Sequence, residues 1–135
     1  MAEVAGLAAS IIAILQLSAT VTSYIRDAKG ATKERDDLAA EITSIKHILV
    51  DLETKSKADE WRDTMKCLGT PGGPLDQFTS VLKLLEGKLK PVIGKGAKFA
   101  KSMMWPFAKT QIKEIFGTME RLKLLFVLAL QNKHQ

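Results

Sequence analysis

The sequence predicts an all-α fold, a four-helix bundle with one short extra helix. Apolar residues recur at helical spacing in four long segments, and no segment alternates between apolar and polar residues as a strand would. Gly and Pro gather between these segments. With 135 residues, of which 46% are apolar and 26% charged, the chain is expected to form a single domain over residues 1–135 around one hydrophobic core.

The first predicted helix runs from about Ala2 to Ala28, and Gly30 is well placed to end it. The 22 positions between Glu3 and Arg26 carry no charge, which reaches the length of a bilayer span. Only the block 4–17 is strongly apolar, because hydroxyl and amide side chains interrupt the segment from Gln16 onward. Such a helix either lies at the centre of a soluble bundle or is held there conditionally.

Small residues are patterned along this first helix. Ala5, Ala9 and Ala13 follow a four-residue spacing, and Gly6 with Ser10 forms a second pair of the same kind. In membranes such rows permit close helix contact and self-association. In a soluble bundle they let neighbouring helices pack closely, and periodicity alone favours this second interpretation.

A second helix is expected from near Thr32, with acidic residues in its first turns that complement the helix dipole. One clean apolar stripe follows, with alternating spacings of four and three: Leu38, Ile42, Ile45, Leu49 and Leu52. Ser56 and Asp59 then predict a short capped helix that continues to about Cys67.

The third and final long helices are expected to begin at prolines, which fit the first helical turn. Pro74 begins the third, which Pro91 limits and whose apolar positions are Phe78, Val81, Leu82, Leu85 and Leu89. The stretch "PVIGKGAKFAKSMMWPF" is expected to be an irregular connection. Pro106 then begins the final helix, with apolar positions Ile112, Ile115, Phe116, Met119, Leu122, Phe126 and Ala129.

The net charge of +5 is distributed unevenly, with −3 over residues 1–60 and +8 over residues 61–135. From Gly87 to Lys113 there are seven lysines and no acidic residue. This stretch is expected to attract an anionic surface, whether lipid, nucleic acid or an acidic protein face. A solvated loop that aids solubility is the alternative.

Catalytic and metal chemistry have little support in the sequence. His47 and His134 have no Cys or His neighbour at metal-ligand spacing, so no metal site or cofactor is expected. Cys67 is the sole cysteine, which suits a reducing, cytoplasmic setting, and we expect a half-buried structural thiol there. "GKG" at Gly94–Gly96 lacks the spacing, the hydroxyl residue and the preceding strand of a phosphate loop. We expect no enzymatic activity.

The order of these parts resembles a known family. The opening "MAEVAGLAASIIAILQLSATVTSYIRDAKGATKERDDLAAEITSIKHILVDLE" and the later "MMWPFAKTQIKEIFGTMERLKLLFVLAL" are similar to fungal HeLo-like domains. Those are N-terminal domains of fungal nucleotide-binding, NLR-type receptors and related cell-death proteins. The resemblance covers nearly the whole chain and implies a four-helix bundle akin to that of the mixed-lineage kinase-like pseudokinase. It also implies that the chain is the N-terminal part of a longer receptor.

The resemblance implies a function in programmed cell death, fungal immunity and heterokaryon incompatibility. The domain would rest in the cytoplasm, oligomerise with itself on activation, reach the plasma membrane and permeabilise it through its N-terminal helix. Carried over to this chain, the membrane-active residues are Val4, Gly6, Leu7, Ala8, Ile11, Ile12, Ile14, Leu15 and Leu17. Other partners would be anionic lipids and receptor or amyloid-signalling domains of the same pathway.

Two further sets of residues complete this hypothesis. Anionic headgroups would contact Lys88, Lys90, Lys95, Lys98, Lys101, Lys109 and Lys113. The turn around Pro106 would either lie at the membrane interface or pack to anchor the final helix, through Met103, Met104, Trp105 and Phe107. The alternative function is a non-lytic oligomerisation or adaptor bundle. Nucleic-acid binding is not favoured, because Arg is scarce and no reading module is present.

Overall fold

The computed structural model describes residues 2–90 and 104–132, and these residues are almost entirely helical. Four long helices are α1 (Ala2–Asp27), α2 (Thr32–Lys55), α4 (Pro74–Leu89) and α5 (Lys109–Asn132). The short helix α3 (Arg62–Leu68) follows a single 3-10 turn, η1 (Asp59–Trp61). Within the described ranges no strand occurs, only an isolated bridge between Lys29 and Met104. The predicted all-α class is confirmed.

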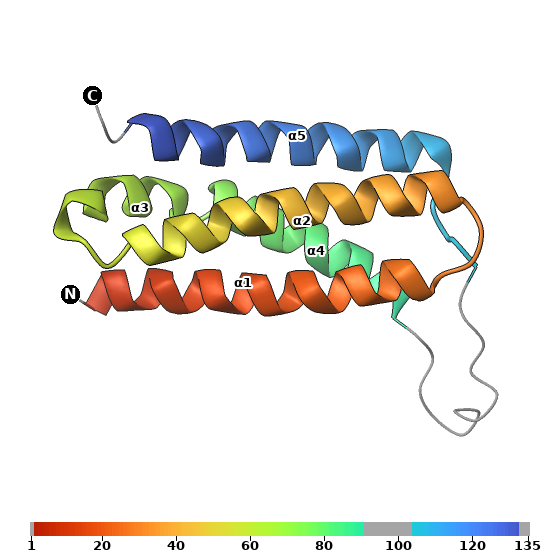
Figure 1. Ribbon diagram of the computed structural model, residues 1–135, viewed down its shortest axis with the longest axis horizontal. Coiled ribbons are helices and arrows are strands. Elements are labelled where there is room, and N and C mark those ends of the chain that lie inside the picture. Colours follow the sequence, from red (N-terminus) through yellow and green to blue (C-terminus); the bar gives the residue numbers. More distant parts are fainter. Residues whose placement is uncertain (1, 91–103, 133–135) are drawn as a thin grey trace, which may run out of the picture.

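The four long helices lie alongside one another, and each contacts two of the others (Figure 1). α1 contacts α2 and α4, while α5 contacts α2 and α4. α1 and α4 run in one direction and α2 and α5 in the other, so the connection from α2 to α4 crosses the end of the molecule (Figure 1). That connection contains α3, which contacts α1. A four-helix bundle with a short extra helix is compatible with this arrangement.

The core forms where the apolar stripes of these helices meet. All five residues of the stripe predicted for α2 are fully buried: Leu38, Ile42, Ile45, Leu49 and Leu52. The stripes of α4 and α5 meet through Phe78 and Phe126, whose rings pack edge to face with centroids 6.4 Å apart. An ion pair of 2.7 Å between Lys123 Nζ and Glu41 Oε1 also joins α5 to α2.

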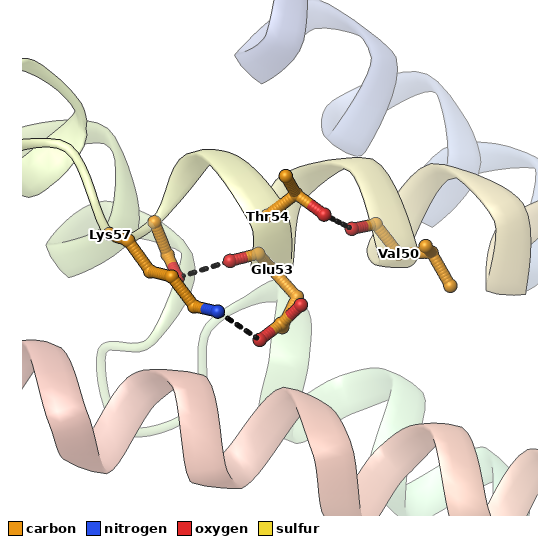
Figure 2. Close-up of polar contacts among 5 residues, drawn as sticks. Val50, Glu53, Thr54 and Lys57 are labelled. Carbon is orange, nitrogen blue, oxygen red and sulfur yellow. Dashed lines mark hydrogen bonds and ion pairs between the residues drawn. The ribbon is translucent and has the colours of Figure 1, made fainter.

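The end of α2 differs from the prediction of a cap at Ser56. Ser56 follows α2, and its hydroxyl donates back to the carbonyl of Glu53 at 2.6 Å (Figure 2). Thr54 likewise donates to Val50 O at 3.1 Å, and Lys57 Nζ lies 4.0 Å from Glu53 Oε1. The residue before η1 is Ala58, so Ser56 closes one helix and caps no other. The short helix itself is confirmed and ends at Leu68.

The two proline predictions have different outcomes. Pro74 occupies the first turn of α4, as expected. Pro106 does not begin the final helix, because α5 begins at Lys109. Residues 104–107 are non-helical, and the backbone N–H of Trp105 donates to the carbonyl of Lys29 at 2.8 Å. Most of the predicted irregular connection, residues 91–103, lies outside the described residues.

Candidate functional site

Helix α1 buries one narrow stripe against the rest of the molecule. Its buried positions alternate in spacing by three and four and are Ile11, Ile14, Ser18, Val21 and Ile25. Ser18 is the polar member, and its hydroxyl donates to the carbonyl of Ile14 at 2.8 Å, so this buried group is satisfied. The stripe lies against α2 and α4, the two long helices that α1 contacts.

The structure divides the predicted membrane-active residues between different faces of α1. Ile11 and Ile14 are buried, whereas Ile12 is 45% exposed and Gly6 is exposed. The intermediate positions are Ala8, Leu15 and Leu17. Val4 and Leu7 belong to the helix, but their side chains lie outside the described set. These residues therefore do not form a single surface in the docked helix.

The small residues that form the two four-residue rows of α1 face outward where they are described. Ala9, Ser10 and Ala13 are exposed, and a Cβ added to Gly6 would meet no atom within 4 Å. The interpretation that this row serves close helix packing within the bundle is therefore wrong for these four positions. Near Ser10 and Ala13 a hollow of about 330 Å³ lies between α1 and α4.

Helix α1 is also the described helix that is long and apolar enough to cross a membrane. The candidate span is Ala8–Asp27, and 28% of its most apolar window is buried. The core helix of a soluble protein and a signal sequence can have the same length and composition, so this is weak evidence. The other residues of that window are half-buried or exposed.

The described lysines of the predicted lipid-contact set are all exposed: Lys88, Lys90, Lys109 and Lys113. They lie where α4 ends and α5 begins, at the end of the molecule opposite the N-terminus of α1 (Figure 1). The 26 residues of α1 span about 39 Å between these two ends. Lys95, Lys98 and Lys101 lie outside the described residues.

The two aromatic residues beside Pro106 pack against other parts of the protein. Trp105 is half-buried, and its Nε1 donates to Glu34 Oε2 at 3.2 Å. Its ring packs edge to face on Phe107, with centroids 5.0 Å apart, and Phe107 is only 7% exposed. Met104, in contrast, is 66% exposed. Met103 lies outside the described residues.

The exposure of Cys67 and of three leucines on α5 was not predicted from the sequence. The expectation of a half-buried thiol at Cys67 is wrong, because this cysteine is exposed. Leu124, Leu125 and Leu128 of α5 are exposed and were not predicted as a surface. The sequence could have indicated this surface, because these leucines are apolar residues that lie outside the apolar stripe of the final helix.

Neither the search for metal ligands among the described residues nor the comparison with known proteins indicates a further site. No cluster of three or more His, Cys, Asp or Glu side chains suited to a metal ion occurs within the described residues. His47 lies on the exposed side of α2. No protein-family model, no curated protein and no solved structure matches this chain.

Proposed function

We propose that this chain is a HeLo-like four-helix-bundle domain that permeabilises the plasma membrane in programmed cell death. The observation that carries the proposal is the state of α1, a helix of span length that carries no charge between Glu3 and Arg26 and buries only one stripe. The proposed activation is sequential: α1 lies docked in the resting domain, and self-association then releases it to lipid. The family resemblance supplies the biological setting.

Releasing α1 from the other helices costs the free energy gained by burying its side chains. Each of its four buried aliphatic side chains, Ile11, Ile14, Val21 and Ile25, contributes about 1.5–3 kcal/mol by burial, or about 6–12 kcal/mol together. Release therefore requires a comparable favourable contribution from association and lipid contact. The exposed small residues support close contact between α1 helices of neighbouring copies once they leave the bundle.

The polar positions of α1 favour shallow insertion or an oligomeric pore over a single-helix span. Gln16 and Ser23 are exposed, and Thr20 is half-exposed with its hydroxyl donating to the carbonyl of Gln16 at 3.2 Å. Such groups are costly in the hydrocarbon core unless they face water or one another. In a pore they would line the aqueous side while the apolar positions contact lipid.

Replacing Ile12 by Glu tests this role without disturbing the core. Ile12→Glu places a charge within the uncharged stretch of α1, and a charge at the centre of an inserted segment costs about 2.5–3.5 kcal/mol. We expect dye release from anionic liposomes to fall strongly. Val50→Glu on α2 is the matched control, because Val50 is 44% exposed and Ile12 is 45% exposed. Equal leakage by the two folded variants would argue against the role of α1.

A non-lytic oligomerisation or adaptor bundle is the second candidate function. The exposed leucines of α5, at positions 124, 125 and 128, favour a protein-contact surface that does not involve α1. Concentration-dependent self-association without liposome leakage would support this candidate over the first.

A further inference from the structure

A hollow of about 450 Å³ lies between the second half of α1 and the middle of α2. Its lining includes two strong cations, Arg26 from α1 and Lys46 from α2, together with His47. The hydroxyl residues Thr22 and Ser23 of α1 also line it. It belongs neither to the buried stripe of α1 nor to the lysine stretch, so the proposed function does not use it.

The cations of this hollow differ from the other cations of the same two helices. Lys33 is paired with Asp37, Arg35 donates to the carbonyls of Gly30 and Arg26, and Lys55 lies over the ring of Trp61. The backbone carbonyl of Arg26 accepts from Arg35, but the side-chain cations of Arg26 and Lys46 make no hydrogen bond or ion pair with any other described residue. The two unpaired cations of α1 and α2 therefore share one hollow.

The hydroxyl groups show a similar contrast. Ser18, Thr20 and Thr43 each donate to the carbonyl four residues earlier, the usual arrangement for a hydroxyl within a helix. The side-chain hydroxyls of Thr22 and Ser23 make no hydrogen bond to the rest of the described chain. Their hydroxyls remain available as donors beside Arg26.

The same hollow contains an opposing charge that restricts the ligand. Asp27 contributes to its lining, and the C-terminal end of α1 carries partial negative charge. A ligand with one negative charge gains little against this background. A phosphate group carries up to two charges and several acceptor oxygens, and it matches the two-pronged donor geometry of an Arg side chain.

We propose that the α1–α2 hollow is a binding site for a phosphate-bearing anion. Arg26 donates to the phosphate oxygens in a two-pronged manner, Lys46 supplies the second positive charge from the facing helix, and His47, Thr22 and Ser23 add donors. The ligand is either a free phosphate compound or the phosphorylated headgroup of a lipid, since both present the same chemistry. Binding joins α1 to α2 and requires neither membrane insertion nor self-association.

Titration with inorganic pyrophosphate tests the free-phosphate source. We expect saturable binding by calorimetry, with a higher melting temperature and shifted backbone NMR signals at Thr22, Ser23 and Lys46. Arg26→Gln and Lys46→Gln should each weaken binding about tenfold, because each removes a charged donor. Lys83→Gln is the matched control, since it removes one exposed positive charge from α4.

Vesicles distinguish the second source. Sedimentation with phosphatidylcholine vesicles, with or without a phosphoinositide, should show Arg26- and Lys46-dependent binding if the ligand is a lipid headgroup. Site-dependent binding to either probe supports the proposal and identifies the source. The proposal is overturned if neither probe binds, or if Lys83→Gln weakens binding as much as the two variants in the hollow. Melting of the ligand-free variants confirms that each is folded.

Discussion

Trp105 connects the beginning of α5 to the turn between α1 and α2 through backbone and side chain. Its N–H donates to Lys29 O, its indole donates to Glu34, and its ring packs on Phe107. The turn it contacts requires unusual backbone conformations, with φ of +86° at Gly30 and +47° at Ala31. Arg35 reinforces that turn by donating from Nε to Gly30 O at 2.6 Å.

Trp105→Phe should destabilise the domain modestly while preserving its fold. The change retains a ring on Phe107 but removes the donor to the Glu34 carboxylate, an interaction worth about 1–2 kcal/mol in a half-buried setting. Urea unfolding followed by circular dichroism measures the expected loss. Glu34→Gln keeps an acceptor oxygen and should cost less. An unfolding midpoint unchanged in Trp105→Phe would contradict the importance of this contact.

Single residues also show why some helix boundaries were not predictable. Pro106 satisfied a local rule for starting a helix, but Trp105 pairs with Lys29 and Phe107 is buried, so distant contacts keep the segment non-helical. Ser56 likewise fitted a capping pattern, yet its hydroxyl donates back into α2. A serine hydroxyl at such a position can donate to a carbonyl of the preceding helix or accept from an N–H of the following one. The sequence allows both, and tertiary packing decides between them.

At the scale of the element, the buried face could be predicted from the sequence for α2 but not for α1. The stripe of α2 stands among charged neighbours, so its 3–4 spacing identified five of the six buried residues of the helix and missed only Ala39. The first half of α1 is apolar around most of its circumference, so periodicity could not tell Ile11 from Ile12. The fold class and the element order were therefore predictable, whereas the face of α1 that contacts the bundle was not.

Weakening the docking of α1 should increase activity while it lowers stability. Ile25→Ala removes a fully buried side chain beyond the apolar block 4–17, so the predicted membrane-active residues are unchanged. The expected loss of unfolding free energy is about 2–5 kcal/mol. Hydrogen exchange should accelerate mainly in α1, and dye release should begin at lower protein concentration.

A second core variant separates loosening of α1 from general destabilisation. Met119→Ala in α5 also empties a fully buried position, with a similar expected loss of about 2–5 kcal/mol. If both variants raise leakage equally at equal stability, specific release of α1 is not the controlling step.

At the scale of the whole molecule, the proposed lipid-binding and inserting parts lie at opposite ends. The four described lysines are near the end of α4 and the start of α5, and the apolar block of α1 begins at the other end (Figure 1). The helix length of about 39 Å exceeds the reach of surface electrostatics at physiological salt, where the screening length is about 8 Å. A domain attached by its lysines therefore presents the N-terminus of α1 to lipid only after α1 moves or the molecule reorients.

Neutralising the lysine end, which is formed by the exposed Lys88, Lys90, Lys109 and Lys113, should therefore weaken attachment strongly without unfolding the domain. Replacing Lys88, Lys90, Lys109 and Lys113 by Gln removes exposed charges worth about 1 kcal/mol each near an anionic surface, so binding to anionic vesicles should fall by roughly a thousandfold. The matched control is the quadruple Gln variant of Lys57, Arg62, Lys66 and Lys83, which has the same net charge but retains the lysine end. Because these four positions lie around α3 and along α4, the control should bind within a few-fold of the unmodified protein. Equal losses in vesicle sedimentation would mean that net charge, and not the lysine end, determines attachment.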